Sequence, residues 1–196
     1  MARFVQVLLA TLVMVFSSAT ATPYSYYASQ DAVVTRAKSI LRPGNNAAQT
    51  QVKGTVEVVT IGRATYIRVH ITGLPSNSVH GFHIHQYGDI ITTGCSSTGG
   101  HYNPYRQTHG AQYDNIRHVG DLGNVYADKD GTVKVVKRDY LISLVGKYNV
   151  LGRAFVLHAL KDDLGRGGNV GSRTTGNAGG RIACGVIVRV PAETKS

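Results

Sequence analysis

Long apolar segments, internal repeats and a long helical period are absent from most of this 196-residue sequence. After residue 21, no apolar run approaches the ~20 residues that a membrane-spanning helix requires, so we expect no membrane span. The Asn-x-Ser/Thr pattern is also missing, and N-glycosylation is therefore not expected. The remaining chain is long enough for one domain with a sizeable core.

Acidic residues are scarce: 11 Asp and Glu stand against 21 Lys and Arg, which gives a formal net charge of +10. Arg3 is the only charged residue before residue 22, so the rest of the chain carries +10 less one, or +9. A basic protein outside the cell would meet polyanions, which predicts weak polyanion binding. No run of Lys or Arg is present, however. A diffusely basic, soluble surface is the alternative, and we expect no specific nucleic-acid binding.

Residues 1–21 have the features of a secretory signal peptide. Arg3 precedes an apolar run over 5–16, and Ala19-Thr20-Ala21 is a small-x-small cleavage site. The run is too short for a membrane helix, although an uncleaved anchor is the alternative. We therefore predict a secreted, extracellular protein. In it, a flexible extension (22–31) and a short tail (192–196) flank one domain (32–191).

From residue 32 onward, the pattern is typical of β-strands. Short segments rich in Val, Ile, Thr and Tyr alternate with turn residues. Gly62-Arg63 predicts a tight turn, and Asp130-Gly131 predicts a hairpin. Residues 32–41 fit a helix face as well as a strand. About eight strands are predicted, over 32–41, 55–61, 65–72, 79–85, 119–126, 132–137, 150–158 and 182–190. Together they indicate an all-β sandwich or barrel with two long loops.

Six of the eight histidines lie between residues 80 and 118, whereas an ordinary soluble domain would scatter them. His83 and His85 are two apart in a predicted strand, so both imidazoles point to one face and can chelate one ion. Imidazole suits both copper and zinc. The alternative is one core histidine and one surface histidine.

A second group follows in a region rich in Gly, Asn, Pro and Tyr. It contains His101, His109, His118 and Asp121. Three imidazoles and one carboxylate make a closed tetrahedral set for zinc. A polar loop with incidental histidines is the alternative, but a loop of this length is usually functional or disordered.

Several strings then match a known family in the same order. They are GFHIHQYGD, GGHYNP, RHVGDLGNV, DKDG, LHALKDDLGRGGN and GNAGGRIACGVI. On these motifs, residues 32–190 resemble the copper/zinc superoxide dismutases, and HQYGD and STGGHYNP are closer to the secreted branch. The resemblance implies an eight-stranded Greek-key barrel or sandwich with two long functional loops. It also implies dismutation of superoxide to oxygen and hydrogen peroxide, and a homodimer.

The resemblance also assigns residues. It implies copper ligands at His83, His85, His101 and His158, and zinc ligands at His101, His109, His118 and Asp121. His101 would bridge the two metals and act in catalysis together with Arg181, which attracts and orients a small anion. Asp162, rather than the adjacent Asp163, would link ligands of both metals by hydrogen bonds. His70 and His80 are expected to be structural.

The chain has two cysteines, Cys95 and Cys184. An even number in a secreted chain suggests a disulfide, with two buried free thiols as the alternative. No Cys-x-Cys or Cys-x-x-Cys pair is present, which argues against a copper-delivery protein. A non-enzymatic copper/zinc-binding protein of the same fold is the alternative function.

The sequence departs from the family in places. The interval from His85 to Cys95 is one residue longer than expected and carries Ile90 and Ile91, which casts doubt on the standard dimer. Gly100 replaces the usual proline. Val170 and Gly171 stand where acidic residues are common, and Arg173 adds positive charge. None of these positions is a predicted ligand.

Overall fold

The computed structural model describes residues 35–44 and 50–191, in which strands with alternating burial dominate. The strands are β1 (Thr35–Pro43), β2 (Lys53–Ile61), β3 (Ala64–Thr72), β4 (Val79–His85), β5 (Asp121–Tyr126), β6 (Val133–Asp139), β7 (Ala154–His158), β8 (Arg181–Val186) and β9 (Val188–Val190). The predictions for the signal segment, the N-terminal extension and the C-terminal tail fall on residues outside the described ranges.

All strand pairs are antiparallel, in the order β5-β4-β7-β8-β1-β2-β3-β6, with β9 added beside β1. This order makes a nearly closed barrel, so the all-β Greek-key prediction is confirmed. The described residues contain nine strands rather than about eight, because the predicted strand 182–190 is interrupted at Ile187. Its N–H bonds to the carbonyl of Arg153 at 2.8 Å, and the chain passes there from β8, which pairs with β7 and β1, to β9, which pairs with β1.

The two predicted tight turns have different outcomes. β2 and β3 form a hairpin up to the pair Ile61 and Ala64, with Gly62 at φ +58° in the turn. Asp130-Gly131 also makes a turn, with Gly131 at φ +70°. The hairpin prediction there is wrong, however, because β5 pairs with β4 and β6 pairs with β3. The turn residues determine only the local reversal of the chain. The burial patterns of β5 and β6 determine which strands they pair with.

The barrel interior is packed with aliphatic and aromatic side chains. Phe82 on β4 and Phe155 on β7 are fully buried, and their rings stack with centroids 5.2 Å apart. Burial of each ring contributes about 1.5–3 kcal/mol. β4 and β7 are nearly continuously buried, and both end in histidine. The core therefore fixes two strand ends from which imidazoles project.

The strands at the two ends of the sheet order, β5 and β6, meet without a hydrogen-bonded ladder in the described part of the chain. A buried ion pair joins them instead. Arg117 Nη2 donates to Asp139 Oδ2 at 2.6 Å, and Asp139 is the last residue of β6. Arg117 Nη1 donates to the carbonyl of Asp121, the first residue of β5, at 2.9 Å.

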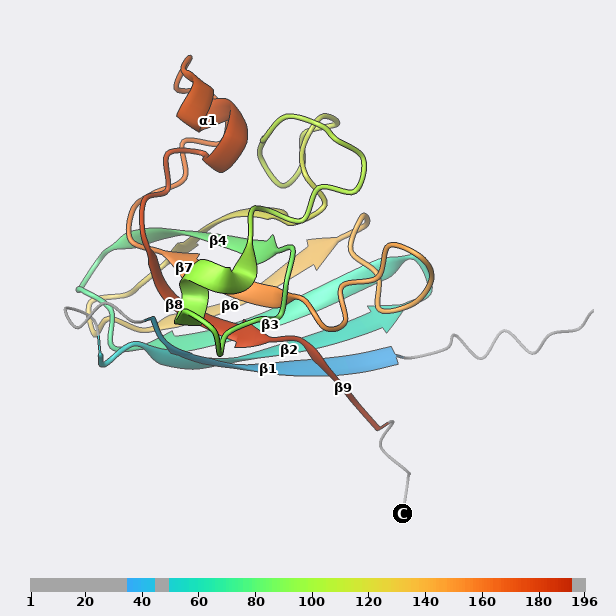
Figure 1. Cartoon of the computed structure of the whole chain (residues 1–196). Coiled ribbons are helices and arrows are strands. Elements are labelled where there is room, and N and C mark those ends of the chain that lie inside the picture. Colours follow the sequence, from blue (N-terminus) through green and yellow to red (C-terminus); the bar gives the residue numbers. More distant parts are fainter. Residues whose placement is uncertain (1–34, 45–49, 192–196) are drawn as a thin grey trace, which may run out of the picture. The chain divides into compact units, whose positions relative to one another are not determined.

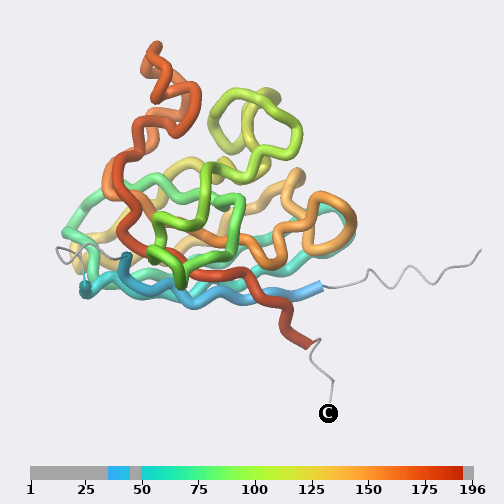
Figure 2. The backbone as a smooth tube through the Cα atoms, in the orientation of Figure 1, coloured from blue at the N-terminus to red at the C-terminus, as the bar shows by residue number. Residues whose placement is uncertain are grey.

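Two long connections, 86–120 and 159–180, rise on the same side of the barrel (Figures 1 and 2). The first contains the short 3-10 helix η2 (Gly94–Thr98), and the second contains the helix α1 (Val170–Thr175), which the sequence did not predict. Asn169 caps α1, because its side chain accepts from Ser172 N. Within the described residues, no helix is long and apolar enough to cross a membrane.

Candidate metal centre

Strand β4 supplies His83 and His85, and the neighbouring β7 supplies His158 at its last position. All three are buried. The ladders are irregular just before His83 and just before His158, and such irregularities re-aim side chains. The three imidazoles converge there with His101 of the first long connection, which forms an isolated bridge with His85.

The first donor set consists of His83, His85, His101 and His158, whose ligand atoms lie within 4.8 Å of one another. His85 Nδ1 donates to the carbonyl of Gly99 at 2.9 Å, and His158 Nδ1 donates to Gly179 at 3.1 Å. Both Nε2 atoms therefore carry lone pairs, and they face each other at 3.2 Å. Such lone pairs repel unless a cation lies between them. His83 Nδ1 and His101 Nε2 are also buried without a hydrogen-bond partner. This nitrogen-only set fits copper.

The second donor set consists of His101, His109, His118 and Asp121. Asp121 Oδ1 lies 2.8 Å from His101 Nδ1, 3.0 Å from His109 Nδ1 and 3.1 Å from His118 Nδ1. His109 Nδ1 is close to this oxygen but outside hydrogen-bond geometry. That arrangement is expected when both atoms are aimed at a shared ion rather than at each other. Three imidazoles and one carboxylate fit tetrahedral zinc.

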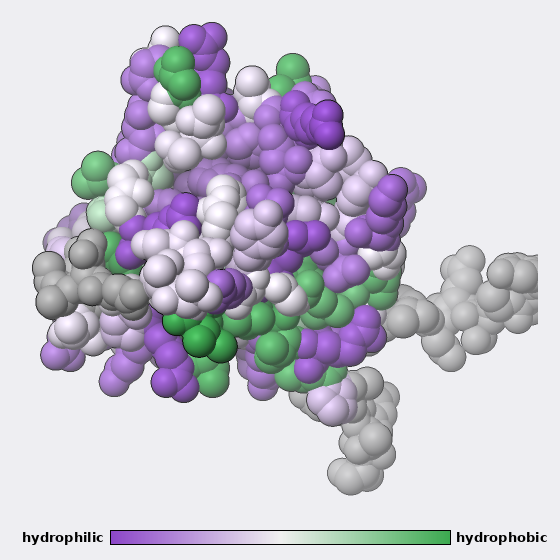
Figure 3. All heavy atoms as spheres, in the orientation of Figure 1, coloured by the Kyte–Doolittle hydropathy of each residue, from purple (hydrophilic) through white to green (hydrophobic). Residues whose placement is uncertain are grey.

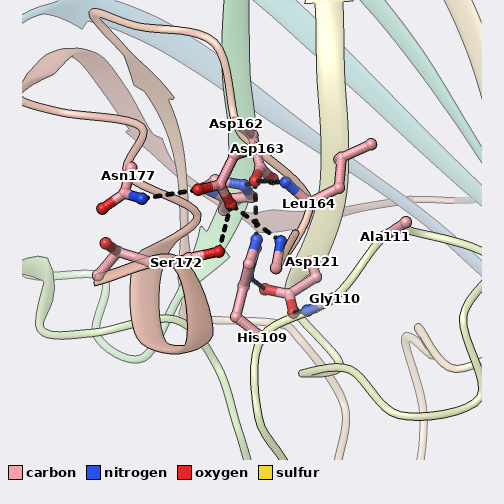
Figure 4. A network of polar contacts seen from close by, with 12 residues as sticks. His109, Gly110, Ala111, Asp121, Asp162, Asp163, Leu164, Ser172 and Asn177 are labelled. Carbon is pink, nitrogen blue, oxygen red and sulfur yellow. Dashed lines mark hydrogen bonds and ion pairs between the residues drawn. The ribbon is translucent and has the colours of Figure 1, made fainter. Parts of the chain in front are cut away.

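Asp162 lies between the two sets. Its Oδ2 accepts from His83 Nε2 and its Oδ1 from His109 Nε2, both at 2.8 Å, and its side chain is fully buried. Figure 4 shows the carboxylate beside His109. These bonds leave the Nδ1 atom of each histidine free to bind a metal. The sequence had no signal for the residue that holds Asp162 itself: Asn124 on β5 exchanges two hydrogen bonds with its backbone, at 2.8 and 2.9 Å.

The two histidines expected to be structural lie in different surroundings. His80 is buried, and its Nδ1 hydrogen-bonds to the carbonyl of His158 at 2.8 Å, so it supports the backbone of a donor. His70 lies exposed on the outer face of β3 and belongs to neither donor set.

Burial tunes the protonation of the donors. It is the main reason why the pKa of His83 is held well below its ordinary value and that of His158 is lowered to about 4. Both rings are therefore neutral and able to bind a metal near neutral pH. Burial would also lower the pKa of His109, but the carboxylates of Asp121 and Asp162 close to its two ring nitrogens outweigh it and raise that pKa to about 9. For Asp121, burial acts to raise the pKa, and close contacts with three histidines hold it well below the ordinary carboxyl range.

A cavity of about 360 Å³ opens onto the first donor set. It is lined by His85, Gly100, His101, His158, Thr175, Asn177, Gly179 and Arg181. Four contacts hold the Arg181 guanidinium. Nη1 donates to the carbonyls of Cys95 and Ser96 and to Thr98 Oγ1, and Nη2 donates to the carbonyl of Gly99 at 2.6 Å. A fixed cation therefore stands beside the donors at the opening.

The segment that holds Arg181 is covalently tied to the barrel. Cys95 in η2 and Cys184 in β8 form a disulfide with Cα atoms 5.6 Å apart, which confirms the predicted pairing. The two cysteines pack with Val156 of β7. The disulfide therefore connects the loop that positions the cation with the strand that carries it.

The site contains two buried donor sets that share one histidine, and a fixed cation lies at the cavity beside them. This arrangement is that of an enzyme that binds two metals, copper and zinc. Residues 52–187 match the model of the copper/zinc superoxide dismutase family (SODC). Superoxide dismutase [Cu-Zn] 2 of Mesembryanthemum crystallinum is 48% identical over 155 residues, which cover 79% of this chain and 95% of that protein. Superoxide dismutase [Cu-Zn] of Paramecium bursaria Chlorella virus 1 is 53% identical over 136 residues, covering 69% of this chain and 72% of that protein.

The chain therefore belongs to the copper/zinc superoxide dismutase family. It is an oxidoreductase that dismutates superoxide with copper and zinc, so the predictions of fold, activity and cofactors are confirmed.

Proposed function

We propose that the first donor set holds copper, that the second holds zinc, and that His101 binds both. One observation carries this assignment: His101 belongs to both sets and presents Nδ1 to Asp121 but an unpartnered Nε2 to the other side. When bound, copper supplies the one-electron oxidation and reduction of superoxide, and zinc supplies a fixed charge without redox chemistry.

The chain's own residues provide anion binding and proton handling. Arg181 lines the cavity beside His85, His101 and His158, where its guanidinium attracts and orients a small anion. His101 Nε2 is a buried ring nitrogen without a protein partner, so it can take up and release a proton next to the bound anion. Asp162 keeps His83 and His109 in the tautomers that ligation needs.

Metal analysis combined with a superoxide-consumption assay tests this assignment. We expect one copper and one zinc per chain, and loss of activity in His101→Ala. His70→Ala is the matched control, because His70 lies on the outer face of β3 and belongs to neither donor set. Two zinc ions, or no copper after copper loading, would contradict the assignment. Full metal content without superoxide consumption would instead support the alternative of a non-enzymatic metal-binding protein.

We also propose that the protein is secreted. The signal features of residues 1–21 support this, and so does the Cys95–Cys184 disulfide, because disulfides persist mainly in oxidising compartments. Expression in a secreting host should yield protein in the medium whose N-terminus lies near residue 22. Retention inside the cell with residues 1–21 still attached would refute the proposal.

A homodimer is the oligomer that we propose. Exposed apolar side chains support it, with Ile91 91% and Val188 52% exposed. Figure 3 shows hydrophobic residues gathered along the lower edge of that view, over β1 and β9. Sedimentation should give twice the chain mass, and Ile91→Asp should shift it to the monomer. Val170→Asp, at another exposed apolar position on α1, should remain dimeric. A monomeric parent protein would refute the proposal.

For polyanions, we propose the outer face of β1, β2, β3 and β6. Aligned residues form rows across it, such as Ile40, Thr55, His70 and Lys134. Its cations are Arg36, Lys38, Lys53, Arg68, Lys134 and Arg138. Among the described outward-facing residues of these strands, Glu57 is the one acid, and it pairs with Lys38 and Arg68. Arg68, His70 and Lys134 also line a hollow of about 400 Å³.

A sulfated polysaccharide column tests this face. Arg68→Gln together with Lys134→Gln, a net change of −2 like that of the control below, should elute at clearly lower salt than the parent protein, because fewer cations contact the chain. Lys147→Glu, which reverses an exposed charge in the loop after β6, should shift elution much less. Equal shifts would indicate a diffuse charge effect without a defined face.

A further inference from the structure

Two adjacent carboxylates, Asp162 and Asp163, serve opposite sides of the same backbone segment. Asp162 bonds to the donor histidines, whereas Asp163 bonds to Ser172 and Asn177, later in the same long connection (Figure 4). Asp163 Oδ1 accepts from Ser172 Oγ at 2.8 Å and from Gly165 N at 3.0 Å. Its Oδ2 accepts from Asn177 Nδ2 at 2.6 Å.

These bonds attach α1 within the helix and just after its C-terminal end. Ser172 is a fully buried residue of α1, and its hydroxyl also accepts from Gly167 N at 2.8 Å. After the helix, Asp163 N donates to the carbonyl of Gly176 at 2.8 Å. Asn177 follows with φ +51°, a left-handed conformation that non-glycine residues rarely adopt. The Asp163 carboxylate is thus one group that holds both the helix and the unusual residue after it.

The segment held by Asp163 forms part of the cavity wall. Thr175 and Asn177 line the cavity together with Arg181 and the donor His158. The same segment has little room to move toward the metal centre, since a Cβ at Gly176 would collide with Asp162 Oδ1. A small displacement of this segment would therefore change the cavity that an anion enters. The segment also contacts one donor, because the carbonyl of Arg173 in α1 accepts from the backbone N–H of His109 at 2.8 Å, so metal content must be measured beside the anion readout.

We propose that Asp163 is a positioning residue for anion entry: it fixes the cavity wall at Thr175 and Asn177 and touches neither metal nor substrate. The proposal rests on the proposed site for superoxide beside Arg181. The direction of the change in rate on mutation distinguishes this positioning role from a simple effect of charge. Removal of a negative charge near the cavity should by itself speed the arrival of an anion, whereas loss of a positioning group should slow it.

Asp163→Asn in the copper- and zinc-loaded protein is the first test. Asn keeps the size but loses one acceptor, so it cannot satisfy Ser172, Gly165 and Asn177 together. We expect kcat/KM for superoxide to fall roughly 10-fold, because misplacement of positioning groups costs about this much or more. The dissociation constant for azide, a small anionic probe read from the copper absorption band, should rise in parallel. Metal content should remain that of the parent protein.

Two further variants and an amide-exchange measurement test the role of Asp163 independently. Ser172→Ala keeps the charge and removes one bond, so it should give the same changes at smaller size. Amide hydrogen exchange should increase across 169–177 in both variants, a readout that needs neither activity nor metal. Asp130→Asn, an exposed acid in the turn before β6, is the matched control and should change none of these quantities.

Several results would overturn the proposal. Faster superoxide consumption or tighter azide binding in Asp163→Asn would show that its charge dominates. Loss of zinc or copper would show that Asp163 supports the metal centre itself. If the parent protein binds both metals and azide but does not consume superoxide, the proposed function fails, while the azide and exchange measurements still decide the role of Asp163.

Discussion

The guanidinium of Arg181 donates a 2.6 Å hydrogen bond to the carbonyl oxygen of Gly99, and the same oxygen accepts from the donor His85 at 2.9 Å. One carbonyl therefore helps to set both the position of the Arg181 cation and the tautomer of a histidine in the first donor set. Arg181 has three further acceptors in the same loop, so its position depends on the planar fork of donors that only arginine provides.

We expect Arg181→Glu to lower kcat/KM for superoxide by at least about tenfold, because it replaces the cation at the cavity with an anion. Superoxide dismutases are themselves a standard example of electrostatic steering. Arg181→Lys should lose much less, since it keeps the charge but not the fork. Pulse radiolysis over a range of ionic strength measures both, and the parent rate should fall with salt, which screens charge over ~10 Å at 0.1 M. A salt-independent rate with Arg181→Glu equal to the parent would exclude guidance by this residue.

Removal of single donors should separate the two metals. His158→Ala should lose copper and retain zinc, because His158 belongs only to the first donor set. His118→Ala should lose zinc preferentially and increase amide exchange in the loop around it, because His118 belongs only to the second set. Elemental analysis after equilibration with both metals provides the measurement. If both variants lost the same metal, the division into two sets would be incorrect.

The disulfide should stabilise the fold and the metal centre together. The cysteines are 89 residues apart, a separation for which the chain-entropy model gives roughly 4.6 kcal/mol. We therefore expect Cys184→Ser to lower the free energy of unfolding by a few kcal/mol. It should also weaken copper retention, because Cys95 lies in the loop that holds Arg181. Urea unfolding of the metal-free and loaded proteins measures the two effects, and an unchanged midpoint in both would contradict this account.

The Arg117–Asp139 pair should matter far more than the surface pairs. Both side chains are buried, and breaking such a pair typically costs about 3–5 kcal/mol because one charge stays buried alone. Asp139→Asn should therefore reduce the free energy of unfolding by an amount in that range. Arg68→Gln is the control, since the exposed Arg68–Glu57 pair is worth roughly 0–1 kcal/mol. Equal losses in the two variants would show that the buried pair has no special role.

The sequence drew attention to the residues of the two donor sets because metal ligation demands particular side chains at particular spacings. His83, His109 and Asp121 are examples, and each lies in one of the two clusters of the structure; that they bind metals stays a prediction. The strands with which β5 and β6 pair could not be predicted. Asp130-Gly131 determines only a local reversal of the chain, whereas β5 and β6 pair with strands distant in sequence. The contacts of Asp163 were also hidden. Its hydrogen bonds reach residues 9 and 14 positions away in an irregular segment, where no periodicity reports on geometry.

The guanidinium that connects β5 to β6 belongs to a residue adjacent in sequence to the second donor set. Arg117 precedes the donor His118 and bonds to the carbonyl of the donor Asp121, while its other end holds Asp139 on β6. In the proposed assignment, zinc would bind residues that flank the one whose hydrogen bonds bring the two edges of the sheet together. The free energy of zinc binding to the folded chain would then add to the stability of this join.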